Sequence, residues 1–237
     1  NGEGFEDIQV WRSRARVVLS PIAAPSVLGL YGFCAATLIV AANLAGWYGN
    51  STSGIYIFPF AAIFGGLAQL LAGMWAYKAR DGLATAMHGM WGSFWLSYGI
   101  LWALIAGHVL AAPAGVYFPE LAFWFIMLAA ITWVGSLAAT AENVGLVATL
   151  VALAAGSSLL AAAYLSGALW LERFGGWVLV GSAGAAFYTA SAMMLENSFG
   201  RTVLPLLKYK KDALVPGRQI TEPIQFPRGM PGVRVGQ

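Results

Sequence analysis

Apolar residues gather in long segments, and polar or charged residues gather in the gaps between them. The segments cover roughly residues 22–46, 54–77, 82–106, 119–140, 143–166 and 174–197. Each is close to the ~20 residues that an α-helix needs to cross a hydrocarbon core of ~30 Å. Because lipid offers the backbone no water to bond with, each segment must be helical. The pattern predicts an all-α integral membrane protein, a bundle of six transmembrane helices.

The polar ends of the chain set the predicted domain limits. Residues 1–21 form an N-terminal cytoplasmic segment, residues 22–200 the six-helix transmembrane domain and residues 201–237 a C-terminal cytoplasmic tail. The tail has no apolar periodicity, so no second folded domain is expected. Short links favour an up-and-down bundle of antiparallel neighbours. The outer links are expected at residues 47–53, 107–118 and 166–173.

Basic residues are distributed unevenly about the segments. Of the 13 Lys and Arg residues, only Arg173 falls in an outer gap. The others lie before the first segment, between the second and third, or after the sixth. Cytoplasmic loops carry this excess. Both termini are therefore predicted to be cytoplasmic, in a multi-pass protein of the plasma (cell inner) membrane.

Composition agrees with a membrane protein. Hydrophobic residues make up 59% of the chain, charged residues 10%, and the mean hydropathy is +0.71. No charged residue or histidine occurs between Val17 and Tyr77. The pI of about 9.1 reflects basic residues beside apolar segments, which suits membrane lipid as a partner and argues against nucleic acid.

Catalytic and metal-binding patterns are missing from the sequence. Cys34 is the single cysteine, so it has no partner for a disulfide or a metal site. His88 and His108 lie twenty residues apart, about 30 Å along a helix, and cannot share a metal or haem. No nucleophile with a base can be drawn either. We expect no catalytic residues, no metal, no cofactor and no enzymatic activity.

Polar groups inside the segments are nearly all uncharged. His88 is the only histidine or charged residue well inside a segment. Gln69 needs several hydrogen-bond partners and is costly to bury without them, which favours a position facing a pathway or bridging helices. The hydroxyls that could face a pathway are those of Thr37, Ser93, Ser97, Tyr98, Tyr188, Thr189 and Ser191.

Two prolines are predicted to shape the helices. Pro25 opens the first helix, where its missing N–H costs nothing and free backbone N–H groups can bind an anion. Pro59 lies inside the second segment, where it removes a hydrogen bond and is expected to bend the helix.

Short motifs occur in order along residues 20–206 and carry a family resemblance. They are Leu28-Gly29-Leu30 with Gly32-Phe33, Phe64-Gly65-Gly66-Leu67-Ala68-Gln69 with Ala72-Gly73 and Tyr77-Lys78, Gly92-Ser93-Phe94-Trp95-Leu96, Gly176-Trp177, and Phe199-Gly200-Arg201-Thr202-Val203-Leu204-Pro205. Together they resemble the succinate–acetate permease family, also called acetate uptake transporters. The resemblance implies six-helix protomers in a hexameric ring, each with its own pathway for acetate and related small carboxylates.

The resemblance also implies site residues. An apolar constriction is expected at Phe33, Trp91 and a leucine of the fifth helix. Counting from Gly135 gives Leu150, and counting back from Gly176-Trp177 gives Leu153, so both are kept. The expected substrate-binding positions are Pro25, Leu28, Gly29, Leu30, Gln69, Ala186 and Tyr188.

The chain departs from the family pattern at a few of these positions. Ala24 stands where the first-helix motif has asparagine, Val27 replaces its second proline, and Trp91 replaces a tyrosine. Ala76 stands where family members commonly have glutamate. These changes bear on which acid is carried more than on the fold.

The leading hypothesis is a transporter or channel for acetate and related small monocarboxylates. Moving a bare carboxylate past apolar side chains is costly, so we expect proton-linked transport or passage of the protonated acid. The expected partners are a small carboxylate, H+, membrane lipid and further copies in a homo-hexamer. A non-transporting six-helix membrane subunit of a larger complex is the alternative, and a channel for a neutral solute is a third hypothesis.

Overall fold

The computed structural model describes residues 22–50 and 52–209, and these residues form helices joined by short links, with no strand among them. Six helical stretches are long and apolar enough to cross a membrane. They are α2 (Pro25–Leu44), a continuous stretch made of α3 (Ser53–Phe60), η1 (Ala61–Ala68) and α4 (Gln69–Ala79), then α5 (Gly82–Ala106), α6 (Pro119–Ala139), α7 (Val144–Ser166) and α8 (Leu169–Phe199). The predicted six-helix architecture is confirmed.

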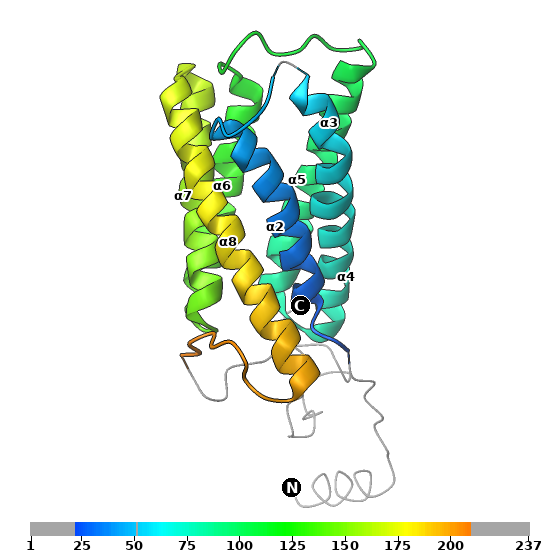
Figure 1. Ribbon diagram of the computed structural model, residues 1–237, viewed down its shortest axis with the longest axis vertical. Coiled ribbons are helices and arrows are strands. Elements are labelled where there is room, and N and C mark those ends of the chain that lie inside the picture. The colour runs from blue at the N-terminus through cyan, green and yellow to red at the C-terminus, as the bar shows by residue number, and fades with distance from the viewer. Residues whose placement is uncertain (1–21, 51, 210–237) are drawn as a thin grey trace, which may run out of the picture.

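The helices run up and down around a common axis (Figure 1). Helix α8 packs between α2 and α7, and α6 packs on α7. Helix α5 packs on the stretch from α3 to α4, and this stretch also packs on α2. Helix α2 begins and α8 ends at the same end of the bundle. Among the described residues this end carries Lys78, Arg80, Arg201 and Lys208, and we call it the basic end.

The start of α8 differs from the sequence-based expectation. The segment was expected to begin near residue 174 after a link over 166–173, but the helix begins at Leu169. Glu172 and Arg173 are charged and were therefore assigned to the link. A helix can extend beyond the hydrocarbon core, and an acidic residue in its first turn is stabilised by the helix dipole. The 31 residues of α8 include both charges.

The helix after Pro59 changes its geometry. Pro59 lacks the N–H that would bond to the carbonyl of Ile55, and a π-helix follows over Ala61–Ala68. A π-helix has more residues per turn than an α-helix, so it rotates the residues beyond it about the helix axis. Gln69 is the first residue after this segment, and the wider turns therefore set the direction in which it points.

Aromatic rings fill the middle of the bundle. Phe33 on α2 meets Trp91 on α5 at a ring separation of 6.4 Å, and Trp91 meets Phe94 at 5.4 Å. Phe94 in turn meets Phe125 of α6 at 5.3 Å. All three pairs are edge-on, the favoured geometry for aromatic contacts. This chain of rings links α2 to α6 across the axis of the bundle.

Gly176 stands where α8 crosses α2. A Cβ there would lie 2.5 Å from the backbone nitrogen of Ala45 and 2.9 Å from the carbonyl oxygen of Ala41. Backbone atoms cannot rotate away, so Gly176→Ala must push the helices apart. We expect a loss of about 1–3 kcal/mol of stability, the usual cost of overpacking. It is measured as a lower thermal unfolding midpoint of the purified protein in detergent.

Gly181→Ala is the matched control on the same helix, because nothing lies within 4 Å of a Cβ at that position. Equal midpoints for the two variants would contradict the close contact of α2 and α8.

Candidate functional site

Two small cavities lie between the helices, one after the other along α2. The lower cavity, toward the basic end, has a volume of about 60 Å³ and is lined by Ala24, Ser26, Leu30 and Phe33 of the α2 side. The upper cavity has a volume of about 30 Å³ and is lined by later residues of α2, from Thr37 to Leu44. Together the cavities follow the axis of the bundle.

The boundary between the cavities is apolar. Trp91 and Leu153 line both cavities, while Phe33 and Leu150 line the lower one. All four side chains are at most 4% exposed. The structure brings together the residues expected at the constriction, and both candidate leucines line the lower cavity. Only Leu153 extends to the upper cavity, so it lies nearer the narrow point.

The Trp91 ring is held in place by a hydrogen bond. Its Nε1 donates to the hydroxyl of Thr132 on α6 at 3.0 Å, and that hydroxyl donates to the carbonyl of Leu128 at 2.6 Å. Thr132 is fully buried. This partner was missed from the sequence, where a single hydroxyl in an apolar segment is usually bonded to its own helix.

Gln69 and His88 form a buried pair on the wall of the lower cavity. Gln69 donates from Nε2 to the carbonyl of Gly65 at 2.9 Å, and its Oε1 lies 3.4 Å from Nδ1 of His88. The His88 ring lies against the backbone of Gly29, where any Cβ would overlap it. Gly29 and Gln69 were both expected at the substrate site, and the structure brings them together around His88, which was not.

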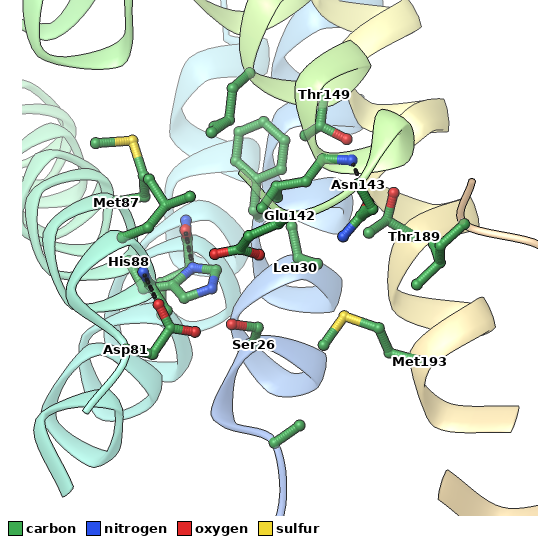
Figure 2. Close-up of a pocket in the computed structure, with 18 of the residues that line it drawn as sticks. Ser26, Leu30, Asp81, Met87, His88, Glu142, Asn143, Thr149, Thr189 and Met193 are labelled. Atoms are coloured by element: carbon green, nitrogen blue, oxygen red, sulfur yellow. Dashed lines mark hydrogen bonds between the residues drawn. The ribbon is translucent and has the colours of Figure 1, made fainter. Parts of the chain in front are cut away.

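Carboxylates gather at the mouth of the lower cavity. Asp81 caps α5 by accepting a hydrogen bond from the Ala84 N–H at 2.8 Å, and Glu142 lies in the link between α6 and α7. Both line the lower cavity, and Figure 2 shows their side chains pointing into it with His88 and Ser26. Burial, together with a smaller effect of the negative charge of Asp81, raises the pKa of Glu142 to about 7.

Asp81 is affected by burial as well. Burial raises the pKa of its carboxyl group, and the hydrogen bond from the Ala84 N–H opposes that change. In the sequence, Glu142 falls between two apolar segments and was not expected at a site. The signal for a site was absent because Asp81 and Glu142 are far apart in the chain.

The residues after α8 fold back beneath the bundle and complete this mouth. The hydroxyl of Tyr188 donates to the carbonyl of Pro205 at 2.8 Å, and the N–H of Tyr209 donates to the carbonyl of Glu142 at 3.3 Å. Lys208 forms an ion pair with Glu196 at 3.0 Å. Leu206 and Lys208 thereby line the lower cavity.

The structure does not bring every expected residue to a cavity. Leu28 is 49% exposed on the outer face of α2. It lies two residues before the cavity-lining Leu30, and two residues on an α-helix point in directions about 200° apart. Tyr188 is 39% exposed and its hydroxyl is bonded to Pro205. Ala186 is fully buried within the helix packing, on neither cavity wall. Pro25 is buried at the start of α2, between the cavity-lining Ala24 and Ser26.

The upper cavity contains polar atoms without partners. The hydroxyl of Thr37 and Nε1 of Trp95 are buried and have no hydrogen-bond partner among the residues that the structure describes. Both residues line this cavity. An unsatisfied buried polar group is costly, so these two atoms are placed to bond with water or a small solute.

Known proteins resemble this chain over most of its length. The model of the GPR1/FUN34/yaaH family matches residues 12–208. The succinate-acetate/proton symporter SatP of Escherichia coli is 29% identical over 189 residues, covering 78% of this chain and 95% of SatP. The meiotically up-regulated gene 86 protein of Schizosaccharomyces pombe is 32% identical, over 66% of this chain and 54% of that protein.

A solved structure has the same fold. The bacterial acetate channel SatP superposes with a TM-score of 0.71 at 25% sequence identity, covering 78% of this chain and 99% of that structure. The helical bundle and the length of the match therefore agree with the sequence motifs.

The raised pKa of Glu142 leads to a pH-dependent prediction. Its pKa rises from an ordinary 4.5 to about 7 in the folded protein, so the folded state favours the neutral carboxyl group. The native state is thus penalised as pH rises from about 4.5 through 7, and the penalty is fully present above that range. Glu142→Gln should raise the unfolding midpoint at pH 8.5 by several degrees and leave it nearly unchanged at pH 4.5.

The measurement is thermal unfolding in detergent, followed by tryptophan fluorescence at the two pH values. Glu120→Gln, at an exposed position at the start of α6, is the control and should show no such difference. A gain that is the same at both pH values would show that ionisation of Glu142 is not its cause.

Proposed function

The chain belongs to the GPR1/FUN34/yaaH family, and from this premise we propose that it carries acetate and related small monocarboxylates across a membrane. The symporter and the channel named SatP are similar to it over more than three quarters of its length. The single observation in the structure that carries the proposal is the apolar constriction. Trp91 and Leu153 separate two cavities that each contain polar groups able to hold a small acid.

The chemistry of the walls favours the protonated acid. Among the described residues, Lys208 is the only Lys or Arg that lines either cavity, and it is already paired with Glu196. A bare carboxylate would lose its hydration at the constriction without gaining a cation, and this loss is costly. The neutral acid avoids most of that cost. Passage of the acid with its proton is therefore the proposed mode of transport.

The polar groups suit an acid that moves in steps. Below the constriction, Gln69 and the start of α2 offer an amide and the positive end of a helix dipole. Above it, Thr37 and Trp95 offer an unpaired hydroxyl and an unpaired N–H. The cavities hold only about 60 and 30 Å³, which favours short monocarboxylates over longer acids.

We propose that the basic end faces the cytoplasm and that the protein lies in the plasma (cell inner) membrane. The support is the excess of Lys and Arg at that end, with Arg173 at the other. We also propose a homo-hexamer on the family resemblance. Because one chain lines both cavities by itself, each protomer would keep its own pathway.

Acetate uptake tests the proposal directly. The neutral fraction of a carboxylic acid falls about tenfold with each pH unit above its pKa. Proteoliposomes should therefore take up labelled acetate more than about tenfold faster at pH 5 than at pH 7.5. Protein-free liposomes measure the leak of acetic acid through lipid, and only the excess over that leak counts. No excess at either pH, with orientation verified, would overturn transport and favour a non-transporting subunit.

The two leucines of α7 should differ in their effect on selectivity. Leu153 reaches both cavities and Leu150 only the lower one. Leu153→Ala should widen the narrow point and raise uptake of a longer monocarboxylate such as butyrate, relative to acetate, by about threefold or more. Leu150→Ala should change that ratio less, because it enlarges a space already open.

The readout is the butyrate-to-acetate ratio of initial uptake rates in proteoliposomes. Leu165→Ala is the control, because Leu165 lies on the same helix and is 41% exposed. A larger change for Leu150→Ala than for Leu153→Ala would place the constriction at Leu150 instead.

A further inference from the structure

His88 is a buried residue of the lower cavity with one ring nitrogen that has no hydrogen-bond partner among the described residues. The residue is 6% exposed, lies on α5 and lines the lower cavity next to the constriction. Its Nδ1 is engaged with Gln69, and no hydrogen bond in the described part of the chain involves its Nε2. Figure 2 shows the ring within the cavity, toward which Asp81 and Glu142 also point.

The hydrogen bonds around Gln69 determine which nitrogen of His88 carries the proton. The carbonyl of Gly65 can only accept, so the Gln69 atom 2.9 Å from it must be the amide nitrogen. The amide oxygen therefore faces His88, and Nδ1 of the ring must donate to it. A neutral imidazole has one donor and one acceptor. Nε2 is thus unprotonated and presents a lone pair to the cavity.

The ring cannot easily turn away from this position. It packs against the backbone of Gly29, where there is no room for a Cβ, and Gln69 is 1% exposed after the π-helix. A backbone contact on one side and an amide on the other hold the imidazole. The acceptor is therefore preorganised below Trp91, one helical turn away on α5.

We propose that Nε2 of His88 is a substrate-binding atom that accepts the hydrogen bond of the carboxylic O–H group of the transported acid. This inference rests on the proposed function and adds to it the group that recognises the acid's proton. The complex holds one shared proton, either as O–H···N or as a carboxylate beside an imidazolium. In both arrangements, one proton is bound together with each acid molecule. A carboxylate without a proton cannot form this hydrogen bond with the neutral imidazole.

The charges that face His88 agree with this role. The carboxylates of Asp81 before α5, Glu142 before α7 and Glu196 on α8 line the same cavity, and Lys208 is paired with Glu196. Helices α2 and α4 contribute no charged residue to this cavity. Among the described residues, carboxylates therefore outnumber cations at this cavity, which disfavours a free anion, and an acceptor nitrogen selects a molecule that brings its own proton.

Three substitutions separate the two nitrogens of His88. Asparagine retains a donor near the position of Nδ1 and can keep the contact with Gln69. Glutamine places an amide near Nε2 and keeps an acceptor in the cavity. Phenylalanine keeps the ring against Gly29 and loses both nitrogens. We expect His88→Asn and His88→Phe to lower acetate uptake at pH 5 about tenfold, the scale of one hydrogen bond, and His88→Gln to retain most of it.

His108→Asn is the control for this series. His108 is the other histidine of the chain, lies exposed beyond α5 and has a positive φ of 58° that asparagine tolerates. Its uptake should equal that of the unchanged protein. Equal loss in all three His88 variants, including glutamine, would indicate a packing role and overturn the proposal.

A spectroscopic measurement tests the assignment without transport. In His108→Asn protein purified through a tag without histidine, 15N-histidine labelling reports only His88. Without acetate, Nε2 should resonate in the unprotonated range and Nδ1 in the protonated range. Acetate at pH 5 should shift Nε2 toward the protonated range, and propionamide, which has no acidic proton, should not.

The outcomes separate this inference from the proposed function. Uptake by the unchanged protein, with normal uptake by His88→Phe and no shift of Nε2, would overturn the role of His88 alone. Failure of the unchanged protein to take up acetate, with no shift of Nε2, would overturn both. A shift with the expected series of variants supports both.

Discussion

The constraint on which this structure depends is that polar groups inside a membrane bundle must find partners within the protein. Regular α-helices pair the polar groups of the backbone, and small residues such as Gly176 allow those helices to pack in contact. The exceptions therefore stand out. The π-helix after Pro59 ends next to Gln69, which lines the lower cavity with His88. The unpaired atoms of Thr37 and Trp95 lie on the upper cavity, while the unpaired hydroxyl of Ser157 lies on neither cavity. The cavities are therefore the main place where the chain departs from regular, fully hydrogen-bonded helices.

Hydropathy was sufficient to predict the six helices because each must match the same membrane thickness. It misjudged α8, since Glu172 and Arg173 look like link residues although a helix can carry charges outside the hydrocarbon core. It also could not predict the π-helix. Pro59 signals only a lost hydrogen bond, and whether the chain kinks or widens depends on neighbours such as Ala36 and Trp95, which pack against Gly65.

Residues of the candidate site could be predicted from the sequence where the residue's own chemistry or motif explains its position. Gln69 is costly to bury unpaired, and Phe33 and Trp91 follow from family motifs; all three line the lower cavity. Thr132 could not be found this way because its role is to hold Trp91 on another helix. The mouth was equally hidden, since the residues around Lys208 fold back to meet Glu142. Distance along the sequence conceals contacts between elements.

The segregation of charge along the chain acts on the chemistry of the site as well as on topology. Basic residues gather at one end, yet Lys208, the only one of the described basic residues on a cavity wall, is paired with Glu196. Within residues 22–50 and 52–209, Asp81 and Glu142 form no ion pair at the mouth, and burial opposes their ionisation. An anion meets repulsion at the mouth and an apolar barrier at Trp91. A neutral acid meets neither, and it alone brings a proton that the free nitrogen of His88 can accept. In the proposed mechanism, the mouth, the acceptor and the constriction would each favour the same protonation state by separate physical means, so the loss of one would weaken the preference without reversing it.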